Sequence, residues 1–229
     1  MEYKEFAKYY DKFYQKKDYQ KEVNFLTNFI NKEDTIIDIG CGTGIHISLF
    51  TKDGYDVDGL DLNKEMLDIA KTRLNTNLYN QNILDININK KYDTIISMFA
   101  VINHLKDTNE LTICLNNLKK ILKDNGKIII DLHNPQSSGS KTDTYDNMTR
   151  IMEWHYNKDT KIEESKICFI INNKKYYDTH TFRIFTIDEI KECCKNVGLR
   201  VTHMYENYDI AKEGTATSKN LQFIIYKDN

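Results

Sequence analysis

The stretch Thr35-Ile36-Ile37-Asp38-Ile39-Gly40-Cys41-Gly42-Thr43-Gly44 decides the fold. Its first five residues are mostly β-branched and lead into glycine, which predicts a buried strand. The three glycines predict a tight loop that feeds directly into a helix, because glycine accepts the backbone angles of such a turn. A strand, loop and helix in this order place backbone amides at a helix N-terminus, where a ligand can approach closely.

Strands and helices alternate on both sides of this unit as far as residue 133. Further strands are expected at 55–61, 77–81, 92–98 and 126–132, the last entered through a turn at Asn125-Gly126. Helices are expected at 3–14, 18–31, 63–74 and 107–122, where apolar residues recur at helical spacing. This alternation predicts an α/β fold with a parallel sheet and helices on both faces.

The alternation of strands and helices ends after residue 133. Residues 135–143 are rich in Ser, Gly and Thr and predict a loop, and β-prone segments follow at 149–156, 161–171 and 176–185. They predict an inserted antiparallel meander. Thr186 caps a helix to about residue 197, and strands at 199–206 and 221–226 close the sheet as a hairpin. We therefore expect lid helices and a core at 1–133, an inserted acceptor lobe at 134–185, and the end of the core at 186–229.

The composition excludes several classes of protein. The chain has 229 residues, 40% hydrophobic and 29% charged, which is typical of one globular core with an insertion. A formal charge of -2 without a dense basic cluster argues against a nucleic-acid partner. No apolar run approaches the roughly 20 residues of a membrane span. Five cysteines without C-x-x-C spacing predict neither a disulfide framework nor a metal site. The N-terminus lacks the apolar core of a signal peptide, so we expect a cytoplasmic protein.

Two carboxylates complete the glycine loop. Asp61 ends the second predicted strand, roughly 20 residues after the loop, where it can accept hydrogen bonds from ribose hydroxyls. Loop and acid together predict an adenosine-containing ligand. Asp38 lies inside an apolar strand and needs a partner such as an ammonium group. A dinucleotide-dependent dehydrogenase is one alternative, although it needs a second mononucleotide half. A tight turn without a ligand is the other.

At these residues the sequence resembles the class I S-adenosylmethionine-dependent methyltransferases. Residues 38–44 match that family's first motif, acid-x-Gly-x-Gly-x-Gly, at every position, and the resemblance covers residues 34–132. It implies a Rossmann-like seven-stranded sheet and S-adenosylmethionine as the cofactor. The cofactor-binding residues that it implies in this region are Asp38, Gly40, Cys41, Gly42, Asp61, Leu62, Met66, Asn82, Ile83 and Met98. Asn82 stands where the family usually has an acid that meets the adenine amino group.

The N-terminus and the segment after the fourth predicted strand extend the resemblance to one group within that family. Tyr10-Asp11-Lys12-Phe13-Tyr14, followed by Tyr19, is similar to the N-terminal lid of small-molecule N-methyltransferases. The likeness is greatest to the N,N-dimethyltransferases of nucleotide-linked amino sugars. Residues 98–105 look like the segment in which those enzymes carry an active-site histidine, here His104. The resemblance implies that Tyr14 and Tyr19 contact the cofactor, and that His104 and Tyr14 act on the acceptor amine.

Four more side chains are candidates for binding the acceptor. His133 follows the fifth predicted strand, at the edge where open α/β sheets bind ligands. Trp154 lies in the meander, and His180 and Arg183 lie on its last strand, where alternation lets only one of them face a pocket. Structural alternatives are a solvated or capping histidine, a solvated arginine, core packing of Trp154, and an aromatic helical face that includes Tyr14.

The sequence therefore predicts methyl transfer from S-adenosylmethionine to a small-molecule acceptor. The first candidate for the acceptor is an amino group of a nucleotide-linked sugar. An O- or C-methyltransferase of another metabolite is the alternative within the class. A nucleotide-binding module without catalysis is the alternative outside it. A small β insertion often needs a partner surface to bury an apolar face, which favours a homodimer through the meander.

Overall fold

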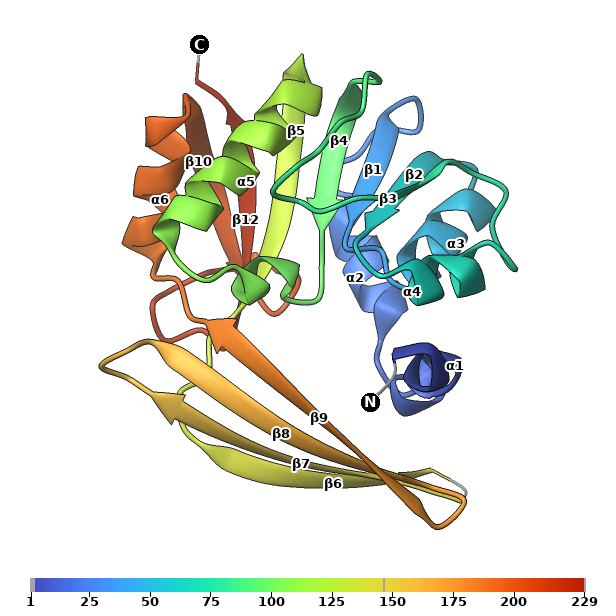
Figure 1. Ribbon diagram of the computed structural model, residues 1–229. Helices are drawn as coiled ribbons and strands as arrows, with labels where there is room; N and C mark the ends of the chain where they lie inside the picture. Colours follow the sequence, from blue (N-terminus) through green and yellow to red (C-terminus); the bar gives the residue numbers. More distant parts are fainter. Residues whose placement is uncertain (1–2, 146, 229) are drawn as a thin grey trace.

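The computed structural model describes residues 3–145 and 147–228, and it contains a larger and a smaller sheet (Figure 1). The strands of the larger sheet are β1 (Thr35–Ile39), β2 (Asp56–Asp61), β3 (Leu78–Asn80), β4 (Tyr92–Ser97), β5 (Leu122–His133), β10 (Leu199–Glu206), β11 (Asp209–Glu213) and β12 (Asn220–Lys227). Their order across the sheet is β11-β10-β12-β5-β4-β1-β2-β3. The strands β1 to β5 are parallel, and β12, β10 and β11 continue the sheet in antiparallel pairs.

Helices cover both faces of the larger sheet, as the alternation predicts. The helices of the described ranges are α1 (Tyr3–Phe13), which lies away from these faces, α2 (Tyr19–Leu26), α3 (Ile45–Lys52), α4 (Lys64–Ala70), the 3-10 helix η1 (Val101–His104), α5 (Thr108–Ile121) and α6 (Ile187–Asn196). Ile36 and Ile96 are buried in a cluster with α2 and α3, whereas Ile37 and Ile95 are buried in a cluster with α5 and α6. Neighbouring residues of one strand thus serve opposite faces, which explains why these strands are apolar throughout.

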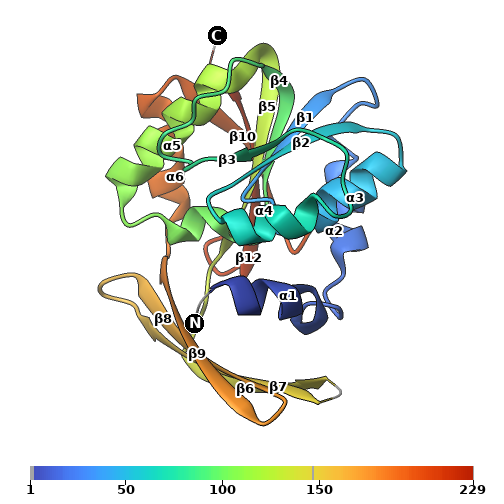
Figure 2. The same cartoon turned by 45° about the vertical axis from the view of Figure 1, so that its right-hand side comes forward.

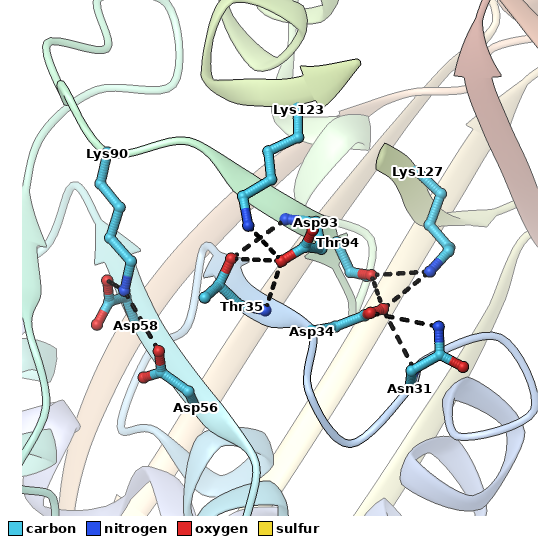
Figure 3. Close-up of polar contacts among 10 residues, drawn as sticks. All are labelled: Asn31, Asp34, Thr35, Asp56, Asp58, Lys90, Asp93, Thr94, Lys123 and Lys127. Carbon is cyan, nitrogen blue, oxygen red and sulfur yellow. Dashed lines mark hydrogen bonds and ion pairs between the residues drawn. The ribbon is translucent and has the colours of Figure 1, made fainter. Parts of the chain in front are cut away.

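Ion pairs join the amino ends of the parallel strands (Figure 3). Lys127 Nζ lies 2.9 Å from Asp34 Oδ2, and Thr94 Oγ1 donates to the same oxygen at 3.0 Å. Burial opposes the charge of Asp34, but these two partners outweigh it and lower its pKa. Lys123 Nζ lies 2.7 Å from Asp93 Oδ2. The carboxylates at this edge therefore have cationic partners, which limits their role to holding the strands together.

The larger sheet has one strand more than the predicted seven. The extra strand, β11, follows a turn in which Asn207 and Tyr208 have φ angles of 55° and 57°. Two consecutive left-handed residues are typical of a type I′ hairpin turn. Most side chains of β11 are exposed, so no apolar alternation marks it in the sequence.

The smaller sheet confirms the predicted antiparallel meander and adds a strand to it. It consists of β6 (Gly139–Tyr145), β7 (Met148–Asn157), β8 (Ile162–Ile171) and β9 (Lys174–Arg183), paired in that order. The loop predicted at 135–143 is wrong from Gly139 onward, because these residues form β6. This edge strand is polar and largely exposed, which hides it from an analysis of hydrophobic pattern.

Several element boundaries differ from the predicted ones. The helix α2 ends at Leu26 instead of residue 31, and α4 ends at Ala70 instead of residue 74. The strand β5 begins at Leu122, four residues before the predicted start, and a register shift against β4 accommodates the Asn125-Gly126 segment. The helix α6 begins as expected with Thr186 as its cap. None of the helices in the described ranges has both the length and the apolar character needed to cross a bilayer.

The smaller sheet lies beneath the carboxyl ends of the parallel strands, and α1 lies between its far end and the core (Figures 1 and 2). Phe13 of α1 is buried in a cluster with Met66 of α4 and with Tyr145, Met148 and Phe169 of the smaller sheet. One end of the inner face of this sheet is thus apolar and holds α1. Its other end faces the strand edge at which ligands bind in α/β proteins.

Candidate cofactor and acceptor site

The glycine loop after β1 is packed on one side and open on the other. Gly40 and Gly42 have φ angles of 76° and 55°, a left-handed region that favours glycine. A Cβ atom on Gly40 would lie 2.4 Å from Val101 Cγ2, so the loop contacts η1 directly. A Cβ atom on Gly42 would meet nothing within 4 Å. The space over Gly42 is therefore where a ligand can approach the backbone.

Four of the five amides in residues 40–44 are used within the protein. Gly40 and Cys41 donate to one carbonyl of β2 at 2.7 and 3.1 Å, Gly42 donates to Asp61 Oδ2 at 2.7 Å, and Gly44 donates to the Cys41 carbonyl at 2.9 Å. A diphosphate at a helix N-terminus requires amides that are free to bind it. The loop is thus poorly suited to a dinucleotide, which argues against the dehydrogenase alternative.

Asp61 lies at the end of β2, beside the open side of the loop. Its Oδ1 accepts from the Asn63 amide and its Oδ2 from the Gly42 amide, each at 2.7 Å. Burial raises its pKa, and the two amides oppose that rise. Each carboxylate oxygen keeps a further lone pair for a ligand hydroxyl. Leu62 next to it is 67% exposed, an unusual state for leucine that fits an apolar cover for a base.

Asp38 is a buried carboxylate without a complete set of partners. It is 1% exposed, and its Oδ2 has no hydrogen-bond partner among the described residues. Burial raises its pKa to about 6; His46 opposes this rise, whereas Asp61, Asp131 and Glu22 add to it. An unpaired buried charge is costly, and four carboxylates in one region favour a cation. The ammonium and sulfonium groups of S-adenosylmethionine fit this environment, whereas a diphosphate does not.

A buried polar cluster holds the start of α2 near the loop. Glu22 is ion-paired to Lys17, and its Oε2 lies 2.7 Å from His46 Nε2. Burial opposes the charge of Glu22, but His46 and Lys17 together lower its pKa. Lys17 Nζ lies 4.2 Å from the Tyr19 ring centre and 4.7 Å from that of Phe99. Tyr19, predicted to contact the cofactor, is therefore placed at this corner of the loop.

Asp11 fastens α1 to the glycine loop, a role that the sequence analysis missed. Its Oδ1 accepts from Thr43 Oγ1 at 2.6 Å, and its Oδ2 accepts from the Arg73 guanidinium at 2.5 Å. Thr43 belongs to the loop, and Arg73 follows α4. The lid helix is thus held in place by the same residues that surround the open loop.

Tyr14 lies between the lid and the smaller sheet. Its ring centre is 4.6 Å from that of Tyr10 and 5.0 Å from that of Phe99, and Arg150 Cζ is 5.0 Å away. Burial raises the pKa of Tyr14, and Arg150 opposes the rise. The buried guanidinium of Arg150 also donates to Asp143 Oδ2 at 2.6 Å. Tyr14 therefore remains a neutral phenol that can donate one hydrogen bond.

Asp131 of β5 holds the turn between β4 and η1, and it too is absent from the predicted site. It accepts from the amides of Phe99 and Ala100 at 2.8 and 2.6 Å, and from Tyr208 Oη at 2.5 Å. Phe99 and Ala100 have φ angles of 67° and 59°, which are uncommon for residues with a side chain. The carboxylate stabilises this turn and thereby fixes where η1 carries His104.

His104 and His180 meet over one aromatic ring of β9. The His104 ring centre lies 4.7 Å from that of Phe182 and 5.9 Å from that of His180, while the His104 residue as a whole is exposed to solvent. Desolvation, and then the charge of His180, lowers the pKa of His104 to about 4. His180 Nε2 lies 3.5 Å from Asp178 Oδ2. His104 is therefore a neutral imidazole near pH 7.

The other predicted acceptor residues divide into two groups. His133 lies 3.0 Å from Glu163 of β8, on the side of the smaller sheet that faces the core. Trp154 belongs to the same face, and its Nε1 donates to the Ser137 carbonyl at 3.0 Å. Arg183 points the other way along β9 and pairs with Glu189 at 2.7 Å. The structure thus brings His104, His133, His180 and Trp154 to one face and leaves Arg183 outside it.

The remaining predicted cofactor residues surround the loop and strand ends. Cys41 and Met98 are buried in the core beneath the loop, and burial raises the pKa of the Cys41 thiol well above its usual range. Asn82 is exposed, and its Oδ1 accepts from the Leu84 amide at 2.9 Å. Ile83 packs against the core. Cys41 and Met98 can therefore reach a ligand only through the backbone or a small part of the side chain.

Comparison with known proteins gives the class to which this fold and site belong. A family model described as a methyltransferase domain matches residues 10–204, and the chain belongs to this family. A solved S-adenosylmethionine-dependent methyltransferase from Clostridium acetobutylicum ATCC 824 has the same fold, with a TM-score of 0.85 over 99% of each chain at 22% identity. The chain is an S-adenosylmethionine-dependent methyltransferase.

Two relatives differ in how much of the chain they match. A dTDP-3-amino-3,4,6-trideoxy-alpha-D-glucopyranose N,N-dimethyltransferase from Streptomyces venezuelae is 30% identical over 132 residues, which span 55% of this chain and 56% of that protein. The putative methyltransferase YqeM from Bacillus subtilis is 25% identical over 97% of this chain and 96% of that protein. The match to the sugar enzyme thus spans about half of its length.

Proposed function

We propose that this methyltransferase acts on an amino group of a small molecule, with an amino sugar linked to a nucleotide as the first candidate. The observation that carries the proposal is the charge of the acceptor side. Glu163 and Asp178 lie on the inner face of the smaller sheet, and their only ion pairs among the described residues are with histidines. A carboxylate-lined face favours a cationic ammonium group over a neutral hydroxyl.

The geometry of the loop supports the following cofactor contacts. Asp61 would bind the ribose hydroxyls, Leu62 would cover the adenine, and Asp38 would pair with the ammonium group of the methionine part. Tyr14 and Tyr19 would close the site from the lid. Bound S-adenosylmethionine supplies a methyl group on a positively charged sulfur, from which a nucleophile can take it.

The protein's own contribution is mainly to position and neutralise the amine. An ammonium group has no lone pair, so the site must bind the neutral amine or remove its proton. His104, neutral near pH 7, and the Tyr14 phenol can both hydrogen-bond to an amine and orient it. Alignment of this kind accounts for most of the rate gain in reactions that need little covalent help.

The name of the Streptomyces venezuelae relative supports an amino sugar as the acceptor. The test offers the purified protein S-adenosylmethionine with a dTDP-linked 3-amino sugar, or with the same sugar carrying a hydroxyl at that position, and analyses both by mass spectrometry. The proposal expects one or two methyl groups on the amino sugar and none on its hydroxyl counterpart. Methylation of the hydroxyl compound, or of a carbon acceptor only, would refute it in favour of an O- or C-methyltransferase.

The homodimer through the smaller sheet stays a prediction. Its outer face carries half-buried Ile151 and Cys168, and Tyr177 there is 65% exposed. Light scattering of the purified protein across a concentration series gives its mass, and a strictly monomeric mass would refute this arrangement.

A further inference from the structure

We propose that His133, held by the buried carboxylate Glu163, accepts the proton of the acceptor ammonium group, and that His104 only orients the acceptor. This inference rests on the proposed amine acceptor. It assigns the base to a pair that combines the end of β5 with the smaller sheet, two parts of the fold that meet only in the tertiary structure.

Glu163 is built to hold a histidine. It is 3% exposed, its Oε2 lies 3.0 Å from His133 Nε2, and its Oε1 accepts from Ser165 Oγ at 3.0 Å. Both carboxylate oxygens therefore have fixed partners. A carboxylate in this position selects the tautomer of the histidine ring and stabilises the positive charge that the ring acquires with a second proton.

His133 is anchored by its backbone and free at its other ring nitrogen. Its amide donates to Asn103 Oδ1 at 2.9 Å, and Asn103 Nδ2 donates back to the His133 carbonyl at 3.1 Å. The side chain is 36% exposed, and Nδ1 makes no hydrogen bond to a residue that the structure describes. The ring can therefore receive a proton at Nδ1 and later release it to solvent.

The surroundings distinguish this histidine from the other two. His133 and His104 contact the same Phe182 ring, with ring-centre distances of 6.1 and 4.7 Å. Glu163 of β8 pairs with His133, and Asp131 precedes it by two residues on β5. His104 and His180 share the Phe182 ring with it, and His180 pairs with Asp178. The neutral Asn220 of β12 lies opposite His133. For His104, desolvation and then the charge of His180 lower the pKa and disfavour the protonated form.

The proposed step balances as follows. The nitrogen–hydrogen bond of the ammonium group breaks, its electron pair stays on nitrogen, and the proton forms a bond to His133 Nδ1. The lone pair then forms the new carbon–nitrogen bond, while the electrons of the carbon–sulfur bond remain on sulfur. Glu163 keeps its negative charge throughout and acts as a positioning residue, since its side-chain hydrogen bonds within the described ranges are to His133 and Ser165.

The test follows the pair with and without an acceptor. In NMR spectra of the ring nitrogens without acceptor, we expect the neutral His133 ring to carry its proton on Nε2, the nitrogen that faces Glu163, and to lose this preference in Glu163→Gln. This variant keeps the shape of the side chain, and its melting temperature checks that it folds. A proton on Nδ1 in the wild type, or the same preference for Nε2 in both proteins, would overturn the proposal. This measurement does not depend on which acceptor is used.

Kinetics then test the role of the pair in turnover. We expect His133→Gln to lower kcat about 100-fold or more, with unchanged affinity for S-adenosylmethionine in calorimetry, and His104→Gln to lower it less than about tenfold. In Glu163→Gln the acid limb of kcat/KM moves to lower pH. His155→Gln, on the exposed outer face of β7, is the matched control without effect. A larger loss in His104→Gln than in His133→Gln would refute the assignment. If the wild type methylates no amine, the proposed function fails, while the NMR result still stands.

Discussion

The substitution Gly42→Ala separates the cost of a strained backbone from the loss of the ligand space. Gly42 has φ 55°, and an added Cβ would meet no protein atom within 4 Å. The only cost to the folded protein is the left-handed conformation, about 1 kcal/mol, which lowers the melting temperature by about 2–4 °C in a chain of this size. In the bound state the methyl group would occupy space that the ligand needs. Overpacking of this kind costs about 1–3 kcal/mol, so the Kd for S-adenosylmethionine should rise about 5- to 150-fold.

Gly54→Ala is the matched control for this experiment. Gly54 has φ 84° and also has no atom within 4 Å of an added Cβ, but it lies before β2, at the opposite end of that strand from Asp61. We expect the same loss of melting temperature in both variants, measured by thermal unfolding without ligand. In titration calorimetry only Gly42→Ala should bind S-adenosylmethionine more weakly. Equal affinity of the two variants would refute the placement of the cofactor over the loop.

Three further predictions concern groups around the loop. Burial raises the Asp38 pKa to about 6, so the charged form is disfavoured in the folded state, and the ligand-free wild type should lose about 3 kcal/mol of stability as the pH rises from about 4 to 6. Asp38→Asn should not show this loss. Parallel pH profiles of the free energy of unfolding for both proteins would contradict the prediction. Asp11→Ala breaks the contacts to Thr43 and Arg73 and should raise the dissociation rate of S-adenosylmethionine several-fold in stopped-flow measurements. The free energy of unfolding should change by about 1 kcal/mol or less. An unchanged dissociation rate would mean that Asp11 does not hold the lid. Phe13→Ala should lower the free energy of unfolding by about 3–5 kcal/mol in urea, because the side chain is only 1% exposed; a loss below 1 kcal/mol would show that α1 is not packed on the smaller sheet.

The parts of the fold that the sequence predicts are those with a local cause. The segment from Thr35 to Gly44 carries both its strand and its turn in its own residue types, and Asp61 follows at the expected spacing. The strands β6 and β11 are edge strands with mainly exposed side chains. Their pairing depends on a neighbouring strand, so their sequences resemble loops.

The site residues that the sequence misses are defined by distant partners. Each forms a side-chain hydrogen bond with a residue far away in the sequence. Asp131 bonds to Tyr208, 77 residues away, and Glu163 to His133, 30 residues away. Asp11 bonds to Thr43, 32 residues away. Single acidic residues of this kind are frequent in any sequence, and only the tertiary structure shows which of them are buried and what they hold. An acid within the aromatic segment 9–14 is the one signal that could have pointed to Asp11.

The claim on which the whole account depends is that the glycine loop, Asp61 and Asp38 hold S-adenosylmethionine. The most direct measurement is a crystal structure with S-adenosylhomocysteine, the product that retains the adenosine and the amino acid part. We expect both ribose hydroxyls within about 3.2 Å of the Asp61 carboxylate. The ammonium group should lie on the side of the loop where Asp38 Oδ2 has no hydrogen-bond partner in the described part of the chain. An adenosine bound away from Asp61, with the space over Gly42 empty, would contradict the account.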